Sequence, residues 1–255
     1  MTAEMRDITG TVVAVTGASS GIGAATARLL VAAGARVAVQ ARRKDRLASL
    51  VEELGEASVV AVPGDAQDPA SADELVQAAV ESFGALDSIV VNAGLGRYGG
   101  ILDSTDDELR EIMRTNVEGT VWAVRSAVRH FRDAADANAA AGAGASGGDV
   151  VIISSVAGLR GGGNEAVYAA TKFAQVGLAG SLDREVRADG IRVTTICPAG
   201  VHTEFAIGAG RVADDPALGD LLRPEDIGSA VLSVLRQPRR MRTTLWSMYS
   251  MAEGS

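Results

Sequence analysis

The chain has 255 residues, of which 47% are hydrophobic, and a formal net charge of −8 at pH 7. This charge disfavours nucleic acid and anionic membranes as partners, and no apolar run approaches the roughly 20 residues that span a bilayer. The first residues lack the parts of a signal peptide, and a single cysteine, Cys197, excludes an intramolecular disulfide, so we expect a soluble cytoplasmic protein.

Apolar, strand-like runs alternate with helical patterns along the chain. Several of these runs are rich in Val and Ile without polar alternation, which is typical of strands covered on both faces. The pattern predicts a single α/β domain over residues 1–255, with a doubly wound, mostly parallel seven-stranded sheet flanked by helices. The expected strands are 11–17, 36–41, 58–62, 86–94, 148–158, 191–200 and 242–248. The expected helices are 22–34, 43–55, 69–84, about 105–131, 165–190 and 224–238.

One segment interrupts this alternation, and a second forms a loop. The Ala/Gly-rich segment 133–148, "DAADANAAAGAGASGG", is expected to be a frayed helix end and a flexible loop. A functional insertion is the alternative interpretation of that segment. The segment 201–222, which follows the sixth strand, is expected to form a small substrate loop.

The first strand runs directly into "TGASSGIG" at 16–23, which opens a helix. Gly17, Gly21 and Gly23 allow a tight turn and close approach of a pyrophosphate, while the helix N-terminus offers N–H groups and a positive dipole end. The spacing differs from the commoner G-x-G-x-x-G, and a glycine-rich turn without a ligand is the alternative. The position between the first strand and the first helix favours dinucleotide binding.

The second strand ends in "VAVQARRK" at 37–44, where an acid would bind the ribose 2′-OH of NAD. Ala41 cannot accept such hydrogen bonds, whereas Arg42, which follows it, can bind a 2′-phosphate through two hydrogen bonds. Arg43 and Lys44 are expected to be secondary. A solvated helix start is the alternative, but cations are disfavoured at helix N-termini. The stretch therefore predicts NADP(H) as the cofactor.

The sequence "YAATK" places Tyr168 and Lys172 one helical turn apart, in a chain with only two lysines. A nearby ammonium favours the phenolate, which suits Tyr168 to general acid/base catalysis near neutral pH. Ser155 ends the strand-like run "VVIISS", and ligands bind at the carboxyl ends of strands in doubly wound sheets. Its hydroxyl could donate to a substrate carbonyl oxygen. A chance pair on an exposed helix and a serine that bonds its own loop are the alternatives.

Five motifs occur in a set order: "TGASSGIG" (16–23), "NAG" (92–94), Asn116 in "RTNVEGT", "ISSVAG" (153–158) and "YAATK" (168–172). Together they resemble the classical short-chain dehydrogenases/reductases over nearly the whole chain. The resemblance implies a Rossmann fold and a catalytic tetrad. Its members would be Asn116, Ser155, Tyr168 and Lys172.

In such a tetrad Tyr168 exchanges a proton with the substrate oxygen. Lys172 lowers the pKa of Tyr168 and holds the nicotinamide ribose, while Ser155 positions the carbonyl. Asn116 holds a water molecule that links Lys172 to solvent.

The resemblance also implies the cofactor-binding residues. Asp65 would contact the adenine, Arg42 matches the position used by NADP-preferring members, and Thr203 would meet the nicotinamide amide. "CPAGVHTEF" at 197–205 departs from the family's usual Pro-Gly, which makes the path of the loop less defined. The predicted cofactor-binding set is Gly17, Ser19, Ser20, Gly21, Ile22, Gly23, Arg42, Asp65, Ala66, Asn92, Ala93, Gly94, Tyr168, Lys172, Pro198, Val201 and Thr203.

The leading hypothesis is an NADP(H)-dependent oxidoreductase that moves a hydride between nicotinamide and a carbonyl or secondary alcohol of a small or medium-sized substrate. The alternatives are a 3-oxoacyl-[acyl-carrier-protein] reductase-like enzyme and a non-catalytic NADP-binding regulatory protein. Three loops, 95–100, 159–166 and 201–210, are expected to line the substrate pocket. Their apolar contacts would come from Leu159, Phe205 and Ile207, and their polar contacts from Arg97, Arg160 and His202.

His130 and His202 show no metal-ligand spacing, so we expect no metal. Cys197 is expected to be a buried strand-end residue rather than a nucleophile. The resemblance suggests a homo-oligomer, either a tetramer or a dimer.

Overall fold

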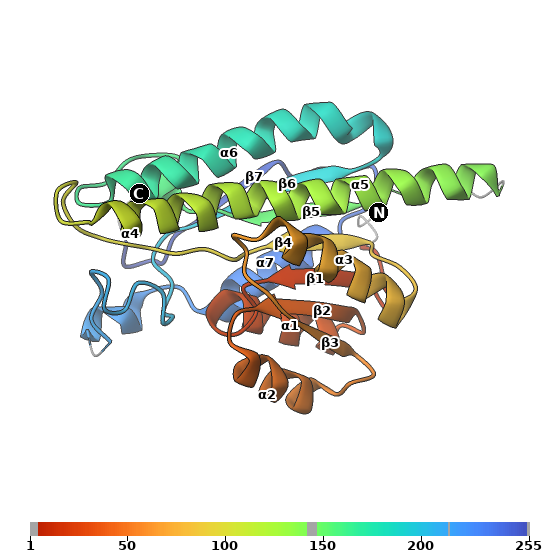
Figure 1. Cartoon of the computed structure of the whole chain (residues 1–255), viewed down its shortest axis with the longest axis horizontal. Coiled ribbons are helices and arrows are strands. Elements are labelled where there is room, and N and C mark those ends of the chain that lie inside the picture. The colour runs from red at the N-terminus through yellow and green to blue at the C-terminus, as the bar shows by residue number, and fades with distance from the viewer. Residues whose placement is uncertain (1–4, 142–146, 214, 254–255) are drawn as a thin grey trace.

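Seven parallel strands form one sheet in the order β3-β2-β1-β4-β5-β6-β7 (Figure 1). The structure is a computed structural model and describes residues 5–141, 147–213 and 215–253. The strands are β1 (Val12–Thr16), β2 (Arg36–Ala41), β3 (Val59–Pro63), β4 (Ser88–Val91), β5 (Asp149–Ile153), β6 (Arg192–Pro198) and β7 (Leu245–Met248). The helices are α1 (Gly21–Ala32), α2 (Lys44–Leu54), α3 (Pro69–Phe83), α4 (Asp106–Met113), α5 (Gly119–Ala140), α6 (Ala166–Val186) and α7 (Pro224–Leu235). The predicted α/β fold with a seven-stranded sheet is confirmed.

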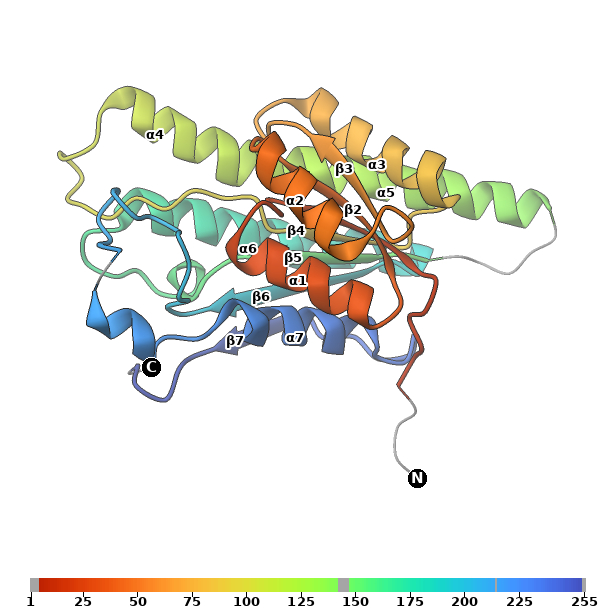
Figure 2. The ribbon, with the colours of Figure 1, turned by 90° about the horizontal axis from the view of Figure 1, so that it is seen from below.

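Buried apolar side chains cover both faces of the sheet. One core contains Leu30 of α1, Leu47 of α2 and Ile227 of α7. The other core contains Leu75 of α3 and Phe131 of α5, and Figure 2 shows α5 and α7 on opposite sides of the sheet. Successive residues of β1 alternate between the two cores, which explains why its sequence is apolar throughout.

The helical segment predicted for about 105–131 is longer in the structure. A π-helical turn, Arg114–Glu118, joins α4 to α5, and α5 continues to Ala140. The prediction of a frayed end and flexible loop is therefore wrong for residues 133–140. Alanine has the highest helix propensity, so this alanine-rich stretch extends the helix. Residues 142–146 of the predicted loop lie outside the described part of the chain.

The segment 201–222 leaves the end of β6 and returns beside its own start. Val201 pairs with Leu222, and the His202 amide donates to the Leu222 carbonyl at 2.8 Å. A short 3₁₀ helix, Pro216–Asp220, lies near its end, and residue 214 is outside the described residues. We refer to this segment as the substrate loop, the role predicted for it.

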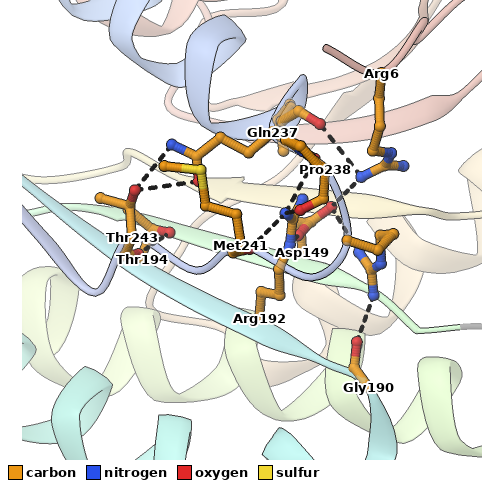
Figure 3. A network of polar contacts seen from close by, with 11 residues as sticks. Arg6, Asp149, Gly190, Arg192, Thr194, Gln237, Pro238, Met241 and Thr243 are labelled. Carbon is orange, nitrogen blue, oxygen red and sulfur yellow. Dashed lines mark hydrogen bonds and ion pairs between the residues drawn. The ribbon is translucent and has the colours of Figure 1, made fainter. Parts of the chain in front are cut away.

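Three arginines surround the buried carboxylate of Asp149, at the start of β5 (Figure 3). Arg192 Nε lies 2.5 Å from Asp149 Oδ1, while Arg239 and Arg6 lie 3.1 and 3.4 Å from Oδ2. Arg192 Nη1 donates to three carbonyls of residues 237–241. Arg192 Nη2 is buried and has no hydrogen-bond partner among the described residues. The cluster joins the N-terminal segment, β5, β6 and the chain after α7 at the amino ends of the strands.

Asp149→Asn is expected to lower the free energy of unfolding by about 3–5 kcal/mol, because it leaves a buried guanidinium without its counter-ion. Denaturant unfolding measures the change. The control is Asp107→Asn, which removes an exposed pair with Arg110 and should cost at most about 1 kcal/mol. Equal, small losses in both variants would contradict this role of Asp149.

Candidate active site

The carboxyl ends of the strands border a cleft of about 1100 Å³. Most of the residues predicted for the site line this cleft, and two lie behind its lining: Gly23 and Asn116. The predicted residues on the lining are Gly17, Ser19, Ser20, Gly21, Ile22, Arg42, Asp65, Ala66, Asn92, Ala93, Gly94, Ser155, Tyr168, Lys172, Pro198, Val201 and Thr203.

The loop between β1 and α1 has the backbone that a tight phosphate-binding turn requires. Gly17 has φ +68° and Gly21 has φ +52°, values that other residues rarely adopt. A Cβ on Gly23 would lie 2.5 Å from the Gly17 carbonyl oxygen, so only glycine allows this packing behind the loop. Asn92 Nδ2 fixes the turn by donating to the carbonyls of Thr16 and Gly17 at 3.0 and 3.2 Å.

The amino end of α1 suits an anion. In the described chain Ser20 makes no side-chain cap to this helix, so the first backbone N–H groups remain available to a ligand. Arg43 lies beside them: its Nη2 is 2.9 Å from Ser19 Oγ and 2.6 Å from Ser20 Oγ. The backbone donors and the guanidinium together fit the phosphates of a dinucleotide.

The basic residues after β2 differ in their surroundings. Arg42 Nη1 lies 3.6 Å from Glu111 Oε1, and the Arg42 side chain is 56% exposed. Arg43, expected to be secondary, is the residue whose guanidinium contacts the phosphate loop. Both line the cleft, so both can reach a phosphate at this corner.

Tyr168 is buried between two aromatic side chains. The ring centroids of Tyr98 and Phe205 each lie 5.8 Å from that of Tyr168, at interplanar angles of 57°. Burial raises the pKa of Tyr168, while hydrogen bonding to the Ser155 hydroxyl opposes this rise. Desolvation is the largest cause of this shift, and the lowering of the Tyr168 pKa by Lys172 stays a prediction.

Lys172 is held by groups on the side away from solvent. Its Nζ donates to the Ile153 carbonyl at 3.1 Å and to Gln175 Oε1 at 3.0 Å, and it lies 5.8 Å from the Tyr168 ring centroid. Burial lowers the pKa of Lys172 to about 8. The residue is therefore close to its titration point in the range where enzymes operate.

Asn116 is connected to Lys172 through a side chain. It lies in the π-helical turn, where its Nδ2 donates to the Leu95 carbonyl at 2.8 Å and its Oδ1 accepts from the Leu95 amide at 2.7 Å. Gln175 Nε2 donates to the Asn116 carbonyl at 2.9 Å, which completes a path from Lys172 through Gln175 to Asn116. A direct role of Asn116 in holding water stays a prediction.

Ser155 lies at the carboxyl end of β5, as predicted. Its Oγ accepts from the Ala157 amide at 3.1 Å and lies 3.4 Å from the Pro198 carbonyl oxygen. The hydroxyl is thereby oriented at the cleft wall beside Tyr168. This arrangement can orient a polar oxygen next to a proton donor.

A family model described as short chain dehydrogenase matches residues 11–211. The chain belongs to the short-chain dehydrogenase family. It is 33% identical to an uncharacterized oxidoreductase of Staphylococcus aureus (strain USA300) over 237 residues, which cover 93% of this chain and 96% of that relative. The resemblance expected from the five motifs is confirmed, and the chain is an oxidoreductase of this family.

Solved structures of short-chain dehydrogenases are similar over almost the whole chain. An alcohol dehydrogenase from the archaeon Thermococcus sibiricus complexed with 5-hydroxy-NADP has a TM-score of 0.83 at 26% identity, over 96% of this chain and 98% of that one. A 3-ketoacyl-(acyl-carrier-protein) reductase from Brucella melitensis complexed with NADH has a TM-score of 0.82 at 28% identity, over 94% and 97%. These relatives bind different nicotinamide cofactors, so the likeness extends to the family and its fold.

The substrate side of this short-chain dehydrogenase agrees only partly with the sequence. Phe205, Ile207, Arg97 and Arg160 line the cleft as expected. Arg97 is paired with Glu108 at 2.9 Å, which reduces its availability to a substrate anion. The other two predicted contacts, Leu159 and His202, lie outside the lining, so that part of the prediction is wrong.

Sequence reasoning missed three residues that contact members of the site. Gln175 lies three residues after Lys172 in the same helix, and this i+3 spacing is a sequence signal that the two side chains are neighbours. Tyr98 and Glu204 carry no local signal, because their contacts with Tyr168 and Arg43 join segments far apart in the chain.

Within the described residues, no group of three or more His, Cys, Asp or Glu side chains could hold a metal ion. Among the described helices, none combines the length and the apolar character needed to cross a membrane.

Proposed function

We propose that this short-chain dehydrogenase is an NADP(H)-dependent oxidoreductase that interconverts a carbonyl and a secondary alcohol, with Tyr168 as the general acid/base. The observation that carries this proposal is one cleft that contains both an anion-binding helix end and the Ser155–Tyr168–Lys172 group. When bound, the nicotinamide supplies or accepts the hydride. A regulatory protein would need the first of these features and not the second.

The roles of the residues follow from their surroundings. Tyr168 Oη would donate a proton to the carbonyl oxygen during reduction and accept it during oxidation. Ser155 would orient that oxygen. Lys172, held by Gln175 and the Ile153 carbonyl, would place an ammonium near the cofactor ribose and the phenol. Asn116 would support this group through Gln175.

NADP(H) is favoured over NAD(H) by the charge of the ribose corner. β2 ends at Ala41, which has no carboxylate for a ribose diol, and Arg42 and Arg43 both line the cleft there. Guanidinium groups bind phosphate through charge-assisted hydrogen bonds. The adenine contact of Asp65 and the amide contact of Thr203 are part of this proposal.

Arg42→Ala and Arg43→Ala are each expected to lower the ratio of kcat/KM with NADPH to kcat/KM with NADH by about 10-fold to 100-fold, because each removes a charged hydrogen bond to phosphate. The matched control is Arg28→Ala, which breaks an exposed pair with Glu53 that joins α1 to α2 outside the cleft lining. An unchanged ratio in both corner variants would assign these cations to a solvated helix start.

A ketoacyl-carrier-protein reductase-like activity is the second candidate, because of the likeness to the Brucella melitensis enzyme. The net charge of −8 opposes it, since an acidic carrier would be repelled unless a local basic patch binds it. A small or medium-sized carbonyl compound, with the apolar contacts of Tyr98 and Phe205, is therefore the preferred substrate class.

We further propose a cytoplasmic homo-oligomer, a tetramer or a dimer. Large apolar side chains are exposed on α4, α6 and β7, including Met113, Phe173 and Trp246. Such side chains are often covered by a second subunit.

The direct test of function is a turnover screen of carbonyl compounds and alcohols with NADPH, NADP⁺ and their non-phosphorylated counterparts. We expect reduction or oxidation of at least one class, faster with the phosphorylated cofactor. Tight NADPH binding without turnover across a broad panel would instead support the regulatory alternative.

A further inference from the structure

Three consecutive residues of the substrate loop contact three different parts of the cleft. Thr203 lies against the amino end of α1, where a Cβ on Gly21 would be 3.1 Å from its Cγ2. Glu204 is paired with Arg43 of the ribose corner and with Arg46 of α2, which lies outside the cleft lining. Phe205 packs on the Tyr168 ring. The position of this short segment therefore connects the phosphate loop, the ribose corner and the general acid/base.

Glu204 is held by two guanidinium groups. Arg46 Nη1 lies 2.8 Å from both carboxylate oxygens of Glu204, and Arg43 Nη1 lies 3.1 Å from Oε2. These arginines lower the pKa of the Glu204 carboxyl, with Arg46 the larger cause. The Glu204 carboxylate is thus an anion of the protein itself, bound in the ribose corner where the 2′-phosphate of the cofactor is proposed to bind.

Arg43 contacts both Glu204 and the phosphate loop. Arg43 contacts Glu204 through Nη1 and contacts Ser19 and Ser20 of the phosphate loop through Nε and Nη2. A 2′-phosphate that binds Arg43 must compete with Glu204 for it or lie beside a like charge. Both situations weaken binding of the phosphate, and neither applies to a cofactor that lacks it.

Building on the proposed NADP(H) function, we propose that Glu204 is a cofactor-specificity residue. Its carboxylate occupies the position beside Arg43 that a 2′-phosphate would take, and a 2′-phosphorylated nucleotide displaces it. Displacement loosens the loop segment that includes Phe205, which packs on the Tyr168 ring. A nucleotide without the 2′-phosphate leaves Glu204 on Arg43 and Arg46 and leaves the loop in place.

The test compares wild type with Glu204→Gln, which keeps the shape of the side chain and removes its charge. The probes are 2′,5′-ADP and 5′-AMP, which differ in the 2′-phosphate and require no catalysis, and calorimetry gives both dissociation constants. We expect Glu204→Gln to bind 2′,5′-ADP about fivefold to tenfold more tightly than wild type and 5′-AMP equally well, since one or two exposed ion pairs no longer compete. The gain should shrink as salt is raised.

The matched control is Glu53→Gln, an exposed glutamate of the same helix as Arg46, about two turns further along, that is paired with Arg28 of α1. It makes the same change of charge and should leave both affinities unchanged. An unaltered preference for 2′,5′-ADP in Glu204→Gln, or an equal gain in Glu53→Gln, overturns the role of Glu204. The two dissociation constants of wild type test the proposed cofactor independently of the variant. If wild type binds 2′,5′-ADP more weakly than 5′-AMP, NADP(H) is not the preferred cofactor.

Hydrogen exchange of residues 203–211 tests the release of the loop. The Ile207, Ala209 and Arg211 amides are bonded within this segment. We expect faster exchange on addition of 2′,5′-ADP to wild type, no change with 5′-AMP, and fast exchange in Glu204→Gln without any nucleotide. Slower or unchanged exchange in wild type with 2′,5′-ADP would contradict displacement of Glu204.

Discussion

Tyr168→Phe is expected to lower kcat about 10²-fold to 10⁴-fold, the range that a positioned general acid or base contributes. The substitution removes only Oη. The ring keeps its packing between Tyr98 and Phe205, so the fold and the affinity for NADPH should remain nearly unchanged.

The measurement is steady-state turnover of a substrate from the screen, together with the NADPH dissociation constant. Tyr249→Phe is the control, because Tyr249 lies outside the cleft lining. A Tyr168→Phe variant with wild-type kcat would exclude Tyr168 as the proton donor. Loss of activity together with loss of NADPH binding would point to a damaged site and would not support the proposed role.

Lys172→Met is expected to have the second largest effect, a loss of kcat/KM of at least about 10²-fold, because the variant removes the ammonium beside Tyr168. Methionine has a similar length and suits a buried position. In this variant the Gln175 side chain and the Ile153 carbonyl lose the hydrogen bond that Lys172 donates, and we expect this structural change to stay local to the active site. Wild-type kinetics in Lys172→Met would contradict the role of the ammonium.

Lys172→Met should also change how the free energy of unfolding depends on pH. Burial lowers the pKa of Lys172 to about 8 from 10.5. Between these values the unfolded chain binds more protons than the folded chain, so the contribution of Lys172 to stability rises with pH across this window. Wild type should therefore gain about 2 kcal/mol relative to Lys172→Met between pH 8 and pH 10. Parallel curves of unfolding free energy against pH would show that this shift is absent.

The sequence was most informative where a function depends on neighbours in the chain. Tyr168 and Lys172 are one helical turn apart, and the phosphate loop is a continuous stretch between β1 and α1, so their spacing alone predicted their proximity. The parallel order of strands then brought Ser155 to the same edge, because carboxyl ends of neighbouring strands meet there.

Prediction failed where contacts between distant segments decide the outcome. Arg43 and Glu204 are 161 positions apart, and no pattern in either segment indicates their pairing. The pKa of Tyr168 depends on burial by Tyr98 and Phe205 from two loops, which spacing from Lys172 could not reveal. The end of α5 differs from the prediction for a local reason: its alanine-rich sequence is typical of low-complexity segments, yet alanine is also the strongest helix former.

The central claim, hydride transfer to a carbonyl in this cleft, has one direct measurement. The purified protein is incubated with the carbonyl panel and NADPH that carries deuterium at both hydrogen positions of the reactive nicotinamide carbon, and the products are analysed by mass spectrometry. We expect an alcohol that carries one deuterium on its carbinol carbon, formed by wild type and nearly lost in Tyr168→Phe. The opposite result, a protein that binds NADPH yet forms no deuterated alcohol from any carbonyl class, would contradict the claim.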